Sequence, residues 1–128
     1  MQVSGKSAWQ ILVVDDEPTV CRAISMMLKY DGHHVQTAMS GETALALFEQ
    51  NSFAIVVTDY LMPEMKGDEL VAIIKARRPG QRIIMATAFA ENFLINGRPA
   101  KGVDWVLEKP FSLEQLRAAV AGVMALPD

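Results

Sequence analysis

Three short runs of aliphatic, mostly β-branched residues constrain the fold of this chain most. They are Ile11–Val14, Phe53–Thr58 and Ile83–Thr87, and polar or proline-containing segments follow each of them. Nearly continuous apolar runs of this length are typical of strands that helices cover on both faces of a parallel sheet. Val35–Ala38 and Trp105–Leu107 are weaker runs of the same type. The sequence therefore predicts five strands.

Segments in which apolar residues recur with helical spacing lie between these strands. They are Pro18–Tyr30, Glu42–Glu49 with Ser40 as its N-cap, Asp68–Ala76, and Ser112–Met124 with a Ser-x-x-Gln capping box. Glu91–Lys101 has little periodicity and contains Gly97 and Pro99, so we expect its helix to be short or irregular.

The strict alternation of strands and helices predicts an α/β doubly wound fold. We expect a five-stranded parallel sheet with five βα units and helices on both faces. The composition, 51% hydrophobic and 21% charged over 128 residues, provides a core for one domain. We place that domain at residues 10–126 and an N-terminal lead-in at residues 1–9.

Charge and hydropathy exclude several classes of function. The net charge is −3 and no run of Lys and Arg occurs, which argues against direct binding of nucleic acid or an anionic membrane. The longest apolar stretch, Ile83–Ala90, is far shorter than the roughly 18 residues of a transmembrane helix. The N-terminus lacks a signal-peptide pattern, and the single Cys21 suits a reducing compartment. We therefore expect a cytoplasmic protein.

Charged and polar residues follow four of the predicted strands. Asp15, Asp16 and Glu17 follow the first, Asp59 follows the third along the chain, Thr87 ends the fourth, and Lys109 follows the fifth. Ligands of doubly wound sheets bind outside the carboxyl ends of the strands, where the strand order reverses. We therefore expect these side chains to converge at one edge of the sheet.

Three crowded carboxylates repel one another unless a cation lies among them. Mg²⁺ (or Mn²⁺) accepts oxygen ligands from one or two carboxylates and from phosphate. We predict Asp16 and Asp59 as ligands, Asp15 as the holder of a metal-bound water, and the main-chain carbonyl of Leu61 as a further ligand. A carboxylate in such a site can attack phosphorus, while Lys109 and Thr87 provide charge and a donor for the phosphoryl oxygens.

These segments resemble the receiver (response-regulator, CheY-like) domain of two-component signalling. The resemblance covers about residues 10–124 and is carried by Ile11–Glu17, Val57–Pro63 with Gly67, Thr87-Ala88, and Glu108–Phe111. It implies a flavodoxin/CheY-like fold. These four motifs and Gly67, five separated segments in the right order and spacing, make the resemblance highly specific.

The resemblance implies that Asp59 is the phosphoacceptor and that Asp15 and Asp16 organise Mg²⁺. Thr87 would move to bond the phosphoryl group, and Lys109 would pair with it, its peptide bond to Pro110 being cis. The donor would be a histidine kinase or a histidine phosphotransfer protein. The output would pass to a downstream protein or a fused output domain, with a homodimer as a further candidate. The domain would catalyse its own phosphorylation and dephosphorylation and would not be an enzyme with a separate substrate.

Two departures from the family pattern matter. The family couples its switch to an aromatic residue on the fifth strand, three positions before the lysine, but this position is Val106, and strand alternation directs Trp105 to the other face. Relatives often carry polar residues two positions after the phosphoacceptor and the threonine, but here these are Leu61 and Phe89. We therefore expect slow self-dephosphorylation.

Two other functions stay open. A degenerate receiver would act as a dimerisation or docking module, although its pocket would normally have lost residues that are present here. A phosphoaspartate hydrolase of the haloacid-dehalogenase type also uses Asp, Mg²⁺, Thr or Ser, and Lys. That family, however, places its two acids as Asp-x-Asp on one strand and usually adds a cap domain.

Overall fold

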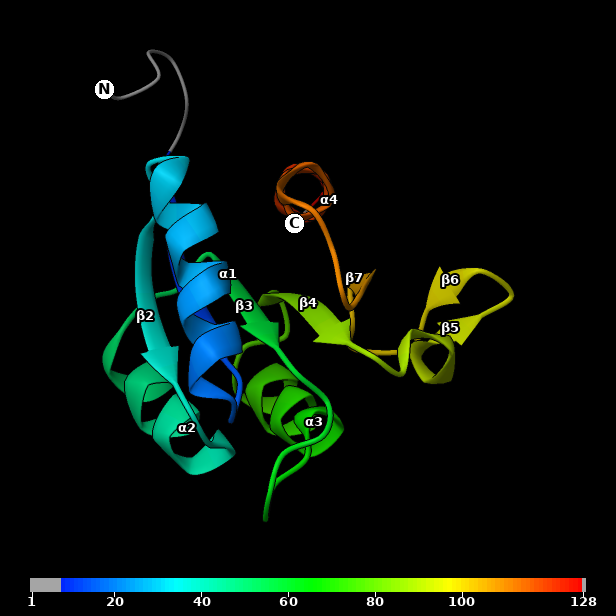
Figure 1. The fold of residues 1–128 in the computed structure, drawn as a ribbon. Coiled ribbons are helices and arrows are strands. Elements are labelled where there is room, and N and C mark those ends of the chain that lie inside the picture. Colours follow the sequence, from blue (N-terminus) through cyan, green and yellow to red (C-terminus); the bar gives the residue numbers. More distant parts are fainter. Residues whose placement is uncertain (1–7, 128) are drawn as a thin grey trace.

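A five-stranded parallel sheet forms the centre of the computed structural model, which describes residues 8–127 (Figure 1). Its strands are β1 (Gln10–Val14), β2 (His34–Ala38), β3 (Ile55–Thr58), β4 (Arg82–Thr87) and β7 (Trp105–Glu108). They lie in the order β2-β1-β3-β4-β7. The predicted parallel sheet is confirmed, and its order reverses between β1 and β3.

Four α-helices cover the two faces of this sheet in the described part of the chain. They are α1 (Pro18–Tyr30), α2 (Gly41–Gln50), α3 (Gly67–Arg77) and α4 (Leu113–Met124). The Ser40 hydroxyl accepts a hydrogen bond from the Thr43 N–H, and Ser112 forms the predicted capping box with Gln115. Both N-caps are therefore confirmed.

Each face of the sheet has its own hydrophobic core. Alternate strand residues such as Ile11 and Val13 pack with α1 and α4, whereas Leu12 and Val14 pack with α2 and α3. The strands are thus buried on both sides, which accounts for their continuous apolar runs.

The segment between β4 and β7 is short and irregular, as expected for the fourth helix. It consists of a 3₁₀ turn, η1 (Ala90–Phe93), and an antiparallel hairpin of β5 (Leu94–Ile95) and β6 (Arg98–Pro99). Asn96 and Gly97 join the two strands with φ angles of 53° and 77°, the backbone of a tight hairpin turn. The hairpin lies beyond β4, away from the helices (yellow in Figure 1).

Trp105 and Val106 lie on opposite faces of β7, as predicted. Trp105 packs with the α1 and α4 core, and Val106 packs with the α2 and α3 core. The Trp105 ring lies directly against Gly122, where a Cβ atom would be 1.9 Å from ring atom Cζ3.

The remaining sequence predictions concern the N-terminus, the cysteine and membranes. Residues 1–7 of the predicted lead-in lie outside the described residues. Cys21 is a buried residue of α1 and forms no disulfide bond. Between residues 8 and 127, no helix has the length and apolar character needed to cross a membrane.

Candidate functional site

Asp15, Asp16 and Asp59 come together where β1 and β3 end. One carboxylate oxygen of each lies within 4.8 Å of the others. The Asp15 N–H bonds the Ala38 carbonyl at 3.1 Å and the Asp59 N–H bonds the Val14 carbonyl at 2.9 Å, so both acids are held by an extension of the sheet ladder. The structure therefore places the three acids at the strand-order reversal, as expected.

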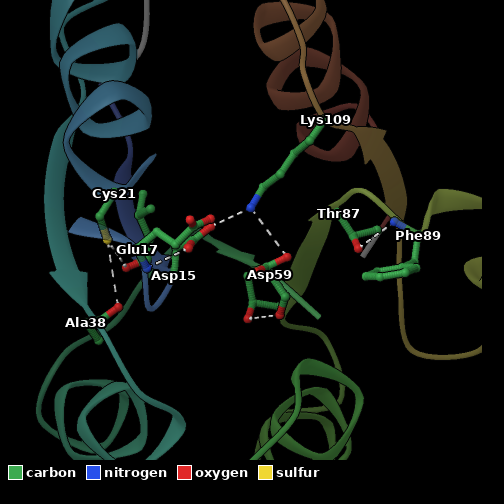
Figure 2. Close-up of polar contacts among 10 residues, drawn as sticks. Asp15, Glu17, Cys21, Ala38, Asp59, Thr87, Phe89 and Lys109 are labelled. Carbon is green, nitrogen blue, oxygen red and sulfur yellow. Dashed lines mark hydrogen bonds and ion pairs between the residues drawn. The ribbon is translucent and has the colours of Figure 1, made fainter. Parts of the chain in front are cut away.

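Lys109 reaches two of these carboxylates from the loop after β7. Its Nζ atom lies 2.6 Å from Asp15 Oδ2 and 3.4 Å from Asp59 Oδ1 (Figure 2). The Lys109 N–H donates to the Thr87 carbonyl at 3.0 Å, and the Lys109–Pro110 peptide bond is cis. One ammonium group thus connects the acids of β1 and β3.

The pKa values of Asp59 and Lys109 reflect this environment. Burial raises the pKa of Asp59, and the charge of Asp15 adds to the rise, while Lys109 opposes it. Burial alone would lower the pKa of Lys109, but its hydrogen bond to Asp15 and the charges of Asp59 and Asp15 outweigh this effect, so the pKa is raised. Asp59 therefore carries a negative charge that the fold disfavours, whereas Lys109 stays protonated.

The loop after β3 is shaped around Gly67. The Gly67 N–H donates to the Tyr60 carbonyl at 2.7 Å, and a Cβ atom on Gly67 would lie 2.1 Å from the Asp59 carbonyl oxygen. In the loop after β1, Asp15 Oδ1 accepts a hydrogen bond from the Glu17 N–H at 3.0 Å. Close backbone approach thus fixes the position of Asp59.

Thr87 ends β4 at the same edge of the sheet, but its hydroxyl is directed elsewhere. Thr87 is fully buried, and its Oγ1 atom accepts a hydrogen bond from the Phe89 N–H at 3.0 Å (Figure 2). The sequence predicted the position of this residue but not this partner.

A cavity of about 570 Å³ opens above the acids. It is lined by Asp16, Glu17, Asp59 and Lys109 and by the less polar Leu61, Met62, Pro63, Ala88 and Phe89. Leu61 and Phe89 are 52% and 43% exposed, so apolar side chains form much of its rim.

The donor set suits a hard divalent cation. The three acids offer only oxygen atoms, and Lys109 is the cation that contacts them in the described chain, so negative charge remains in excess. Leu61, whose carbonyl was the further predicted ligand, lines the same cavity. The residues present therefore fit Mg²⁺ or Mn²⁺.

Comparison with known proteins agrees with this geometry. Residues 11–121 match the family described as response regulator receiver domain. The Mycobacterium tuberculosis protein named "Probable transcriptional regulatory protein TcrX" is 36% identical over 107 residues, which cover 83% of this chain and 45% of TcrX. The chain thus spans less than half of that relative.

Two solved structures share the fold closely. A response regulator receiver domain protein from Clostridium thermocellum has a TM-score of 0.82 at 31% identity, covering 92% of this chain and 94% of the other. The response regulator TrrA from Thermotoga maritima, in complex with Mg²⁺ and BeF, has a TM-score of 0.81 at 29% identity, covering 89% and 97%. On these matches and on its fold, the chain belongs to the response regulator receiver domain family.

Proposed function

We propose that this domain accepts a phosphoryl group on Asp59 and so relays a two-component signal. The observation that carries the proposal is Lys109 Nζ, which lies between Asp15 and Asp59 at the edge of an open cavity. An Asp59 Oδ atom attacks phosphorus, the new O–P bond forms, and the bond from phosphorus to the donor breaks. With a phosphohistidine donor, the imidazole nitrogen leaves with the bonding electrons and takes up a proton.

The side chains of Lys109 and Thr87 have different roles in this phosphoryl transfer. The raised pKa of Lys109 keeps its ammonium charged, so it attracts the phosphoryl oxygens and offsets the charge that Asp59 gains. Thr87 contributes a hydroxyl donor at the end of β4. The domain would thus catalyse its own phosphorylation and dephosphorylation and would not turn over a separate substrate.

Asp15, Asp16 and Asp59, with the Leu61 carbonyl, would hold Mg²⁺ or Mn²⁺. When bound, the ion supplies positive charge that balances the acids and draws in the phosphoryl oxygens. The proximity of the three carboxylates supports this assignment. So does the Mg²⁺ in the similar structure of TrrA.

We propose the receiver domain as residues 10–126, in a cytoplasmic protein. The donor would be a histidine kinase or a histidine phosphotransfer protein. Because TcrX is named a transcriptional regulator and extends well beyond the matched segment, a fused output domain is one proposed partner. A separate target protein and a second copy of the chain are the others.

Intact-mass measurement after incubation with acetyl phosphate and Mg²⁺ tests the proposal. We expect one stable phosphoryl group on the wild-type chain and none on Asp59→Asn, with Glu108→Gln as a control for loss of an exposed acid outside the cluster. Donor turnover without accumulation would instead indicate a phosphoaspartate hydrolase. Absence of any reaction would indicate a docking module.

We also propose that the phosphoryl group on Asp59 is lost slowly. Leu61 and Phe89 flank the cavity, and neither side chain can orient an attacking water molecule. Leu61→Asn and Phe89→Gln should therefore shorten the phosphoryl lifetime, measured as decay of the mass adduct, while Leu126→Asn on the exposed C-terminal segment should not. A wild-type adduct that decays rapidly, at a rate unchanged in both variants, would contradict this mechanism.

A further inference from the structure

Two ring contacts connect the end of β3 with the segment after β4. The Tyr60 and Phe89 ring centroids are 6.3 Å apart at 72°, and those of Tyr60 and Phe93 are 4.9 Å apart at 64°. Both are edge-to-face contacts, which are favourable and depend on ring orientation. Tyr60 directly follows Asp59 in the chain, so the first of the three contacting rings belongs to the neighbour of the proposed phosphoacceptor.

The same segment contacts Thr87 through its backbone. The Phe89 N–H donates to Thr87 Oγ1 at 3.0 Å (Figure 2). Thr87 is fully buried, whereas Phe89 is 43% exposed. The position of the hydroxyl and the conformation of the segment after β4 are therefore coupled by one hydrogen bond.

Phe93 extends this connection to the β5–β6 hairpin. Phe93 is buried as the last residue of η1, and its carbonyl accepts a hydrogen bond from the Ala100 N–H at 2.6 Å, next to β6. β5 begins at the next residue, and its side chains, Leu94 and Ile95, are exposed. A displacement of η1 would thus move an exposed apolar hairpin.

The β7 strand offers no such ring on this face of the sheet. Val106 occupies the α2 and α3 side, where Tyr60 and Phe93 also pack. Trp105 lies on the opposite face, against Gly122. In the described chain, both ring–ring contacts involve Tyr60.

We propose that Tyr60, Phe89 and Phe93 form an aromatic relay that transmits occupancy of the phosphorylation site to the β5–β6 hairpin. The relay rests on the proposed function. A phosphoryl group on Asp59 presents oxygen acceptors, and the Thr87 hydroxyl turns toward them. The Phe89 N–H then loses its acceptor, the Phe89 ring changes its contact with Tyr60, and η1 moves with the hairpin.

Backbone amide NMR on the intact chain tests the relay, with Mg²⁺ and BeF₃⁻ as the probe in place of the phosphoryl group. In the wild-type chain we expect shifts of the Phe89 amide, of the Ile95 amide in the hairpin and of the Ala100 amide next to it. Phe93→Leu keeps an apolar side chain but removes the ring contact. It should keep the Phe89 response and reduce the population shift at the hairpin by about 2- to 12-fold, the effect of one edge-to-face pair.

Phe48→Leu is the matched control, because Phe48 is also buried but belongs to α2. Its hairpin response should equal that of the wild type, whereas Tyr60→Leu, which removes both ring contacts, should reduce the response at least as much as Phe93→Leu. A full hairpin response in Phe93→Leu and Tyr60→Leu would overturn the relay. So would a wild-type hairpin that stays unchanged while the Phe89 amide shifts. If the wild-type chain binds no BeF₃⁻ at all, the proposed function fails and the relay fails with it.

Discussion

Removal of the Asp59 charge should stabilise the metal-free domain. In the Asp59→Asn variant, two repulsive carboxylate pairs disappear together with one attractive contact to Lys109. The acid oxygens lie no more than 4.8 Å apart and Lys109 Nζ lies 3.4 Å from Asp59; at these limits, and with an effective dielectric constant of roughly 20, each repulsion is worth about 3.5 kcal/mol and the attraction about 5 kcal/mol. The difference, taken with the acids at this upper limit of separation, predicts that the free energy of unfolding rises by about 2 kcal/mol, and burial of the lost charge acts in the same direction.

In saturating Mg²⁺ the wild-type chain should have a higher free energy of unfolding than Asp59→Asn, the opposite of the order expected without metal. An ion bound only to the folded state stabilises it by about 2.7 kcal/mol at a hundred times its dissociation constant. Asp59→Asn removes one proposed ligand, so the variant should gain less than the wild-type chain.

Urea unfolding followed by circular dichroism, in EDTA and in Mg²⁺, measures both effects. Glu108→Gln removes an exposed acid at the end of β7 and should change neither free energy by more than about 0.5 kcal/mol. The electrostatic reasoning is refuted if Asp59→Asn unfolds at lower urea than the wild type in EDTA. It is also refuted if Glu108→Gln stabilises the chain equally.

Further predictions concern charge, backbone contact and pH. Lys109→Met leaves the buried Asp15 carboxylate without its cation and should lower the metal-free free energy of unfolding by about 3 kcal/mol in urea titrations; a loss below about 1 kcal/mol would contradict the assigned ion pairs. Gly67→Ala forces a Cβ atom onto the Asp59 carbonyl and should cost about 1–3 kcal/mol, whereas Gly80→Ala, with open space around its Cβ position, should be neutral in thermal melts. Burial lowers the pKa of His33 from 6.5, so the unfolded chain binds a proton that the folded chain resists, and stability should fall as the pH drops below about 6.5. His33→Gln should flatten this pH dependence in urea titrations; a variant whose profile equals that of the wild type would contradict the assignment.

The sheet was predictable because its strands are buried on both faces. Continuous apolar runs located β1, β3 and β4 within two residues, and the Ser40 and Ser112 caps located two helix starts. The β5–β6 hairpin was not predicted. Its turn, Asn96-Gly97, is a strong hairpin signal, but two-residue strands are too short for any periodicity, and Pro99 argues against a strand.

The candidate site was predictable in its members but not in its contacts. The ends of parallel strands meet at one edge, so Asp15, Asp59 and Lys109 could be placed together from their positions after strands. Side-chain rotamers decide the rest. The shorter contact of Lys109 is to Asp15, which is distant in the sequence, and not to Asp59, and the Thr87 hydroxyl accepts a hydrogen bond from the Phe89 N–H; neither choice of partner follows from the position of a residue after a strand.

Trapping of the acyl phosphate tests the central claim most directly. After incubation with acetyl phosphate and Mg²⁺, borohydride reduces an aspartyl phosphate to homoserine, and tandem mass spectrometry of the digested chain identifies the modified position. We expect homoserine at position 59 in the wild-type chain and at no position in Asp59→Asn. Homoserine at position 15 or 16, or a wild-type chain without homoserine, would contradict it.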